Sequence, residues 1–376
     1  MIKSIRTQGS IAVFVGRFVA ASFAACSGLA AANAAQAQAG DVFTSTNTAA
    51  GNSVLRVHRL ANGRLIGVAS YPTGGNGAGA SLGSQGALTL AWGNHFLYVV
   101  DAGSNDIAGF KVQPLNLTHI SNTSSAGTTP VSLTTWGNLL YVLNSGGAGS
   151  ISGYQIQSNG TLSPIPGSVQ ALSSTSAGAA EISFSPDGQE LVVTEKATNK
   201  IDVFPVGQGG AAGEVIVTSS FGLTPYGFAF DAAGHLIVSE AAGGAKAGGS
   251  VSSYFVSGYG SLPVTGSALN DQTAPCWIAV SGRYAWTTNA GSGTISGYYI
   301  NGNGTLQLIG NGGVAANIGA TSKPLDMGLD AAGQYLYVLE GGYGAIGAYR
   351  VQADGSLVSI GSAGSLGTGL SGLVSY

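Results

Sequence analysis

A unit of about 45 residues recurs along this chain and constrains the fold more than any single motif. Its clearest copies are LLYVLN-SGGAGS-ISGYQIQ-SNGTL (140–162), YAWTTN-AGSGT-ISGYYI-NGNGTL (284–306) and YLYVLE-GGYGA-IGAYRVQ-ADGSL (335–357). Each copy holds two short β-rich runs around a small-residue turn, followed by a hairpin turn of the NG or DG kind. Such self-similarity is typical of propellers and solenoids.

Each full unit contains four strand signals in a fixed order. A short apolar strand opens the unit, and a tight turn leads to a second strand of the YVLN kind. A third strand of the ISGYQI kind and a weaker fourth strand follow. The six opening strands are GALTLAW (86–92), PVSLTTW (130–136), AAEISFS (179–185), PYGFAFD (225–231), CWIAVSG (276–282) and PLDMGLD (324–330).

The two ends of the repeat region are incomplete in complementary ways. Near the N-terminus, DVFTSTN (41–47), SVLRVHRL (53–60) and IGVASY (66–71) lack an opening strand, whereas LSGLVSY (370–376) is an opening strand with nothing after it. Joined, they make one more unit and leave no exposed sheet edge. The sequence therefore predicts an all-β, seven-bladed β-propeller with four antiparallel strands per blade, in which the C-terminal strand completes blade one. No helical periodicity follows residue 40, which argues against an α/β fold.

Residues 1–39 differ in composition from the repeats. Lys3 and Arg6 precede an Ala-, Val- and Phe-rich stretch that ends in the small-x-small sequence Ala-Gln-Ala at 37–39. This arrangement indicates a secretory signal peptide. We therefore expect a signal peptide over 1–39, one propeller domain over 40–376, and a periplasmic or secreted protein.

Two features bear on membrane attachment. Arg17 interrupts the apolar run, which argues against a permanent span of about 20 apolar residues. The segment Phe23-Ala24-Ala25-Cys26 loosely matches a lipoprotein box, so a lipid anchor at Cys26 stays open as an alternative.

The charge balance and the cysteine count limit the kinds of partner that we expect. Signal removal would leave ten of the 13 Lys and Arg residues against 16 Asp and Glu residues. This acidic balance argues against nucleic acid or anionic lipid as a partner. Cys276 would be the remaining thiol, either a buried small hydrophobe beside Trp277 or a reactive group. We expect a monomer.

No cofactor or metal site is predicted. Gly79–Gly83 matches G-x-S-x-G, but it lies in a Gly-rich interblade loop, without the strand and helix that a nucleophile elbow requires. The Gly-rich stretches 74–83 and 243–249 do not fit a phosphate-binding loop. Both are predicted to be flexible loops on one face of the ring.

The YVLN strands, the PDGQELVV segment (186–193) and the DG-S-L hairpins carry a family resemblance over essentially all of 41–376. The chain resembles the lactonase-type seven-bladed propellers, the family of 6-phosphogluconolactonase and carboxymuconate cyclase, and the related YVTN-repeat surface propellers. The resemblance implies the propeller fold directly. It implies the activity weakly, because the matching residues are turn and core positions.

Strand order assigns residues to faces. If opening strands begin at the top, the links between second and third strands and between blades also lie at the top. The polar residues that end the second strands would then form a ring there: Asn47, Asp101, Asn144, Glu195, Glu240, Asn289 and Glu340. They could bind a ligand, and their four carboxylates could bind a cation or hold a general base with a raised pKa. Alternatively, they only start turns.

Glu181 and Lys323 are the candidate catalytic residues. Glu181 lies near the top of an opening strand, in an Ala-Glu-Ile segment that resembles one in lactonase-family sequences. A carboxylate there could act as a base toward water or a lactone ring. Lys323 opens another such strand and is the only cation predicted on the inner rim. A structural role, in which Glu181 pairs with Lys323 or Lys200, stays open.

The resemblance also implies histidine and arginine on the top face, to polarise a carbonyl and hold a carboxylate or phosphate. In this chain every histidine and every arginine after residue 40 is predicted in bottom turns or outer strands. Without an arginine fork, phosphate would have to be held by lysine alone. This argues against a phosphorylated sugar lactone as substrate.

Two functions follow as hypotheses. The first is an exported, non-catalytic propeller that binds a small ligand or a surface partner at the top of the channel, where Tyr226, Trp277 and Tyr343 could stack against a sugar or aromatic ring. The alternative is a lactone hydrolase or carboxymuconate-type cyclase that uses Glu181 with Lys323.

Overall fold

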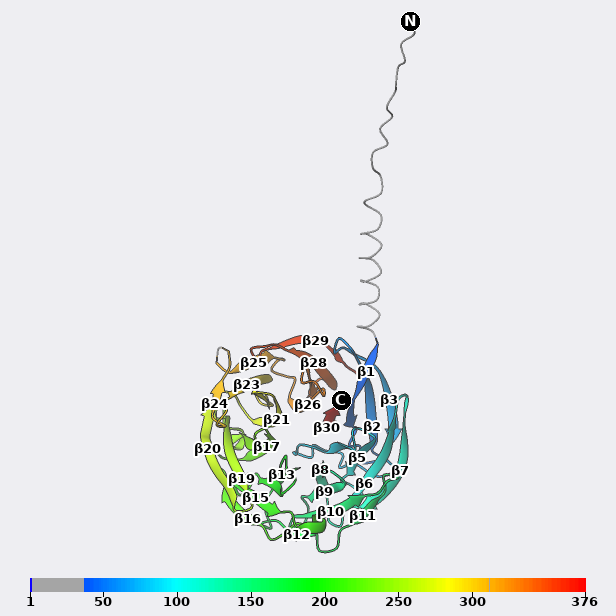
Figure 1. The fold of residues 1–376 in the computed structure, drawn as a ribbon, viewed down its shortest axis with the longest axis vertical. Helices are drawn as coiled ribbons and strands as arrows, with labels where there is room; N and C mark the ends of the chain where they lie inside the picture. The colour runs from blue at the N-terminus through cyan, green and yellow to red at the C-terminus, as the bar shows by residue number, and fades with distance from the viewer. Residues whose placement is uncertain (2–36, 311) are drawn as a thin grey trace.

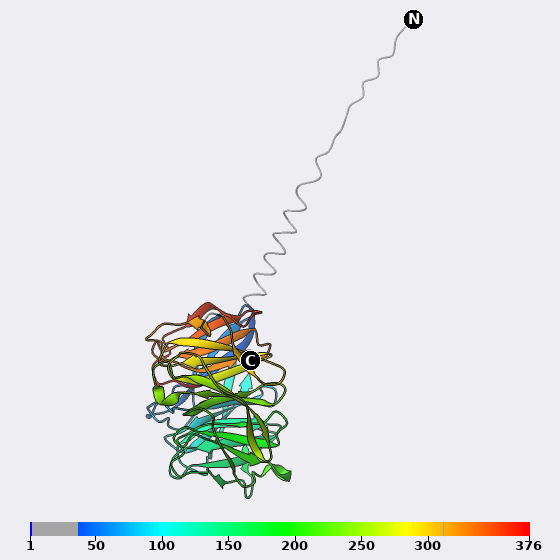
Figure 2. The ribbon, with the colours of Figure 1, turned by 90° about the vertical axis from the view of Figure 1, so that its left-hand side faces the viewer.

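The computed structural model describes residues 1, 37–310 and 312–376, and it confirms the predicted propeller. Seven antiparallel sheets are arranged in a ring around a common centre (Figure 1), which is the position of the channel in a propeller. Figure 2 shows the ring edge-on, with the strands crossing from one face to the other. Most of the expected leader, including Cys26, lies outside the described residues. Among the residues described, no helix is long and apolar enough to cross a membrane.

Each blade is built from an inner strand at the channel to an outer strand at the rim of the ring. Blade one consists of β30 (Ser371–Ser375), β1 (Gln38–Ser45), β2 (Ser53–Leu60) and β3 (Leu65–Pro72). Blade two consists of β4 (Leu88–Ala91), β5 (Phe96–Asp101), β6 (Asp106–Gln113) and β7 (Asn116–Ser124). Blade three consists of β8 (Pro130–Trp136), β9 (Leu139–Asn144), β10 (Ser150–Ile156), and an outer edge shared by β11 (Leu162–Pro164) and β12 (Gln170–Ala171).

Blade four consists of β13 (Ala179–Phe184), β14 (Glu190–Glu195), β15 (Lys200–Pro205) and β16 (Ile216–Ser219). Blade five consists of β17 (Pro225–Phe230), β18 (His235–Glu240), β19 (Ser250–Ser257) and β20 (Gly260–Leu269). Blade six consists of β21 (Pro275–Ser281), β22 (Tyr284–Asn289), β23 (Thr294–Ile300), and an outer edge shared by β24 (Leu306–Leu308) and β25 (Val314–Asn317).

Blade seven consists of β26 (Pro324–Leu329), β27 (Tyr335–Glu340), β28 (Ala345–Val351) and β29 (Leu357–Ala363). Two short 3₁₀ turns, η1 (Gln208–Gly210) and η2 (Ala242–Gly244), lie in the links of blades four and five.

In blades two, three, six and seven, an aromatic residue of the second strand donates a hydrogen bond to a main-chain carbonyl of the next blade. The Tyr98 hydroxyl donates to the Gly160 carbonyl at 2.8 Å, and the Tyr337 hydroxyl donates to the Gly63 carbonyl at 3.0 Å. These glycines lie in NG-type hairpins at positive φ, which a residue with a side chain rarely adopts. The second strand of one blade is therefore bonded to the hairpin turn of the next blade.

In blades three to seven, the pairing of the inner strand with the second strand shifts register near the first residues of the inner strand. Hydrogen bonds to the preceding blade are made at these shifts. In β17 the shift lies between Pro225 and Phe228, and the Phe228 N–H donates to Glu181 Oε2 of blade four at 2.6 Å. The Ile182 N–H of blade four likewise donates to Ser132 Oγ of blade three at 3.2 Å. A bulge interrupts the local ladder, so a side chain of the preceding blade satisfies the backbone donor.

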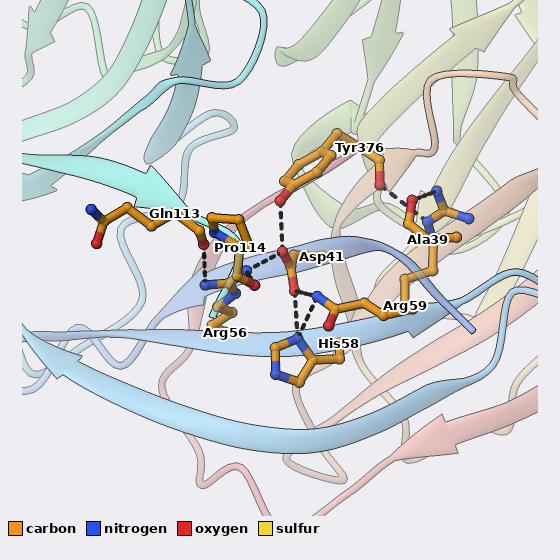
Figure 3. Close-up of polar contacts among 9 residues, drawn as sticks. Ala39, Asp41, Arg56, His58, Arg59, Gln113, Pro114 and Tyr376 are labelled. Carbon is orange, nitrogen blue, oxygen red and sulfur yellow. Dashed lines mark hydrogen bonds and ion pairs between the residues drawn. The ribbon is translucent and has the colours of Figure 1, made fainter. Parts of the chain in front are cut away.

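Ring closure confirms the prediction for blade one, because β30 pairs with β1 (Figure 1). A buried ion pair joins Asp41 Oδ2 to Arg56 Nη2 at 2.6 Å, and the Tyr376 hydroxyl donates to the same carboxylate oxygen at 2.6 Å (Figure 3). Arg56 also donates to the Gln113 carbonyl of blade two. Although burial disfavours the charged form, hydrogen bonds from Arg56, Tyr376 and His58 hold the pKa of Asp41 below its usual value.

Candidate functional site

The link between blades one and two enters the channel instead of running over the surface. Gln85 precedes the inner strand of blade two, yet its N–H donates to the Ala180 carbonyl of blade four at 3.0 Å. Its side-chain amide pairs with the main chain of Ile278 in blade six: Nε2 donates to the carbonyl and Oε1 accepts from the N–H, both at 2.9 Å. Because blades four and six do not adjoin blade two, residues 81–86, which we call the channel segment, must lie across the channel.

Neighbours of Gln85 extend this attachment to further blades. Ser84 Oγ donates to the Val131 carbonyl at 2.9 Å, and Trp277 Nε1 donates to the Ser84 carbonyl at 2.8 Å. The Gly86 N–H donates to Asp326 Oδ1 at 3.2 Å. The channel segment is thus bonded to blades three, four, six and seven. Because residues 84–86 bond to other blades, β4 begins only at Leu88, although the sequence predicted an inner strand from residue 86.

The channel segment lies against two buried carboxyl groups. Glu181 is 6% exposed, and burial raises its pKa well above the usual value, with a further rise from nearby Asp326. Burial raises the pKa of Asp326 to about 7, although the Gly86 and Gly372 N–H groups donate to it. Asp326 is a residue that sequence reasoning missed. It occupies the third position of its inner strand, as Glu181 does, and that shared position was the available signal.

The structure separates the two predicted catalytic residues. Glu181 is buried between blades four and five, whereas Lys323 is exposed at the rim of blade seven. Within the described residues, no ion pair joins Glu181 to Lys323 or Lys200. The partner of Glu181 is instead the Phe228 N–H, which is the interblade role filled by Ser132 in blade three.

Lys323 is not the only cation at the inner rim, so that prediction was wrong. Lys196 reaches inward from the end of β14, and its ammonium donates to the Gly83 carbonyl of the channel segment and, at 3.3 Å, to the Ala179 carbonyl. The ammonium also lies 4.8 Å from the centre of the Tyr226 ring. Burial lowers the pKa of Lys196 to about 8. The pattern of strand-end residues pointed to Glu195, one residue earlier.

The three aromatic candidates lie in different environments. Tyr226 and Trp277 are 8% and 4% exposed and pack against each other with ring centres 5.0 Å apart. Cys276 is buried in the same cluster, as a small hydrophobe would be. Tyr343 is 48% exposed, and it alone presents an open ring.

The ring of strand-end residues is buried, and its side chains bond to their own blades, to the interblade links and, for Asp101, to Asn52 and Thr73 at the end of blade one. Glu240 accepts hydrogen bonds from the Gly222 N–H and from the hydroxyls of Ser250, Ser252 and Ser267. The other members are Asn47, Asp101, Asn144, Glu195, Asn289 and Glu340. Asn47 differs, since it holds the start of the channel link through the Ala80 carbonyl. Among the described residues, no three Asp, Glu, His or Cys side chains are grouped to hold a metal.

A cavity of about 470 Å³ lies beside the channel segment on the top face. Its walls include Ser81 of the channel segment, Ala290, Leu325 and Leu370, and Lys323 is the only charged residue among the described residues that line it. Lys323 has a left-handed backbone (φ 44°) just before the proline that opens β26. No histidine or arginine of the described chain lines this cavity. The site can therefore offer one positive charge and an apolar wall.

Comparisons with known proteins agree with the fold. The family described as Lactonase, 7-bladed beta-propeller matches residues 148–245. No curated protein matches the chain.

Three solved structures are similar throughout. A putative 6-phosphogluconolactonase from Bacteroides fragilis is 18% identical, with a TM-score of 0.67 over 90% of this chain and 98% of its own. A periplasmic gluconolactonase from Pseudomonas aeruginosa is 18% identical, with a TM-score of 0.68 over 89% and 98%. A Lactobacillus plantarum protein is 15% identical, with a TM-score of 0.72 over 90% and 100%. By its blades and its ring closure the chain is a seven-bladed β-propeller, and its residues 148–245 match the lactonase family of such propellers.

Proposed function

We propose that this protein is an exported binding propeller that holds a small ligand in the top-face cavity beside the channel segment. The observation that carries the proposal is the pairing of an apolar wall with one lysine in a cavity of about 470 Å³, which is large enough for a small molecule. A ligand that suits this site has an apolar body and a carboxylate, because Lys323 supplies the only charge among the described residues that line the cavity. The channel segment is bonded across the channel beside this cavity, so the ligand would lie at the mouth.

The test is a binding screen of small aliphatic and aromatic carboxylic acids, followed by calorimetry on the hits. Lys323→Met keeps the apolar stem and removes the ammonium, so we expect about tenfold weaker binding or more, from the loss of a charged hydrogen bond worth about 1.5–3 kcal/mol. Lys111→Met changes an exposed lysine on β6 and serves as the matched control. Hits that bind equally well to Lys323→Met would refute the proposed site.

Export rests on the composition of residues 1–39. Cleavage after residue 39 would remove the first two residues of β1 and leave Gly40 paired with Arg59. The mass of the protein recovered from the periplasm or medium tests this. We expect a chain that starts near Gly40. Lipidation at Cys26 or an uncleaved N-terminus would contradict signal removal at this position.

Lactone hydrolysis remains the second candidate, because two of the similar structures are named as gluconolactonases and Glu181 lies at the channel with a raised pKa. For Glu181 to reach a substrate, the channel segment would have to leave. A lactone panel assayed with the wild type, Glu181→Gln and the exposed control Glu214→Gln tests this. Turnover that is lost only in Glu181→Gln would favour hydrolysis over binding alone.

A further inference from the structure

A second cavity lies at the seam between blades three and four, on the opposite face of the ring from Lys323. Its volume is about 320 Å³, and it is lined by the turns that join the inner strand to the second strand in each blade and by the ends of the third strands β10 and β15. These turns lie at the far end of the blades from the ring of strand-end residues. The Tyr141 hydroxyl donates to the Gly210 carbonyl at 2.7 Å, which ties the two blades together at this seam.

One wall of this cavity is the ring of Trp136, which is 44% exposed. Gly188 lies against one side of the ring, because a Cβ at Gly188 would come within 2.3 Å of the indole atoms Cδ2 and Cε2. The indole Nε1 donates to the Pro186 carbonyl of blade four at 3.3 Å. These two contacts fix the orientation of the ring, so its exposed surface is a preorganised flat platform for a ligand.

Three side-chain amides surround the cavity: Asn138, Gln155 and Gln189. All three are exposed, and none makes a side-chain hydrogen bond within the described chain. The equivalent cavity between blades six and seven has Arg283 and Tyr299 at the repeat positions of the first two amides. There the guanidinium donates to the Tyr299 hydroxyl at 2.8 Å, so the two side chains bond to each other. Between blades three and four, by contrast, both positions hold amides that are available to a ligand.

Asp187 is the only charged side chain among the described residues that line the cavity. Its carboxylate already accepts hydrogen bonds from the Ser185 hydroxyl at 2.7 Å and from the Gln189 N–H at 3.2 Å, and the bond from Ser185 holds the pKa of Asp187 below its usual value. The lining residues include no cation that could pair with an anionic ligand. The cavity therefore offers a flat aromatic surface beside amides that both donate and accept hydrogen bonds.

We propose that this cavity binds a neutral pyranose sugar. A pyranose ring has a face of C–H bonds that stacks on an aromatic ring, and a rim of hydroxyls that each donate and accept a hydrogen bond. The Trp136 ring suits the first feature, and the three amides suit the second. The volume lies at the lower end of the range of roughly 300–1,000 Å³ found for ligand pockets, which suits one sugar unit. A hexose has about 12 non-hydrogen atoms, so an ordinary ligand efficiency gives a dissociation constant of about 2 mM.

Saturation-transfer NMR of the full chain with the methyl glycosides of glucose, galactose, mannose and N-acetylglucosamine tests the proposal, and calorimetry measures the affinity of each sugar that binds. Trp136→Ala removes the stacking surface, so we expect the affinity to fall about tenfold or more. Gln155→Ala removes one amide from an exposed position and should weaken binding about three- to tenfold. The control is Tyr259→Ala, which removes an aromatic ring that is 95% exposed and lies outside the cavity. Circular dichroism confirms that each variant is folded.

Binding that Trp136→Ala weakens and Tyr259→Ala leaves unchanged would support the site. Absence of binding by all four sugars at about 20 mM, ten times the expected dissociation constant, would overturn it. Unchanged affinity in folded Trp136→Ala would show that the sugar binds elsewhere and would also overturn it. If Trp136→Ala fails to fold, Gln155→Ala decides in the same way. Lys323→Met should leave sugar binding intact, and a loss in that variant would assign the sugar to the top-face cavity and overturn the site at this seam.

Discussion

Replacing Gln85 with alanine should loosen the channel segment. The change removes both hydrogen bonds between the Gln85 amide and the Ile278 main chain, each at 2.9 Å. A hydrogen bond contributes about 1 kcal/mol net, and a buried group left without a partner costs about 1–3 kcal/mol. Ile278 is 1% exposed, so water reaches the freed groups poorly. We expect a loss of about 2–4 kcal/mol in the free energy of unfolding.

Thermal unfolding and hydrogen exchange measure this loss. An unfolding entropy of about 2.1 cal/mol/K per residue over roughly 340 propeller residues gives about 0.7 kcal/mol/K, so Tm should fall by about 3–6 °C. Exchange should rise in peptides that contain 81–86 and Ile278, because the Gln85 N–H bond weakens with the segment and the Ile278 N–H loses its acceptor. The matched control is Gln307→Ala, at an exposed position of β24, which should leave Tm within about 1 °C.

A Gln85→Ala protein with unchanged Tm and unchanged exchange over 81–86 would refute this reasoning. It would mean that the bridge to Ile278 does not hold the channel segment in place.

Two further predictions concern stability. Arg56→Met leaves Asp41 buried without its cation, so we expect the free energy of unfolding to fall by about 3–5 kcal/mol and Tm to fall by about 4–7 °C. Arg350→Met changes an exposed arginine and should have little effect on Tm. Equal melting temperatures for the two variants would contradict a buried ion pair at the ring closure. Burial raises the pKa of Asp202 and of Asp326 to about 7, whereas the unfolded carboxyls titrate near pH ~4. Between these two pH values the folded protein binds more protons than the unfolded chain, so the free energy of unfolding should fall as the pH rises. Melting at pH 5.5 should therefore exceed melting at pH 8, and a flat or reversed profile would contradict the burial of these carboxyls.

The repeat made the ring and its closure predictable, because strand order and hairpin turns are local signals that recur. The YVLN tyrosines and the NG hairpins predicted a scaffold, and the Tyr98–Gly160 contact shows what joins them. The position of Glu181 on an inner strand was predicted correctly for the same reason.

The channel segment could not be predicted from the sequence. It lies in a Gly-rich link with no periodicity, and the residue that anchors it, Gln85, bonds to Ile278, 193 positions away. Lys196 was missed for a related reason, since its inward course depends on the Gly83 carbonyl that the segment brings into the channel. Contacts of this kind arise from tertiary packing and leave no mark in local composition.

A crystallographic screen with small carboxylic acids and lactones tests the proposed binding site most directly. We predict a ligand in the top-face cavity, with its acid group on Lys323 and residues 81–86 still across the channel. A ligand against Glu181, with the channel segment displaced, would contradict this prediction and would place the site inside the channel.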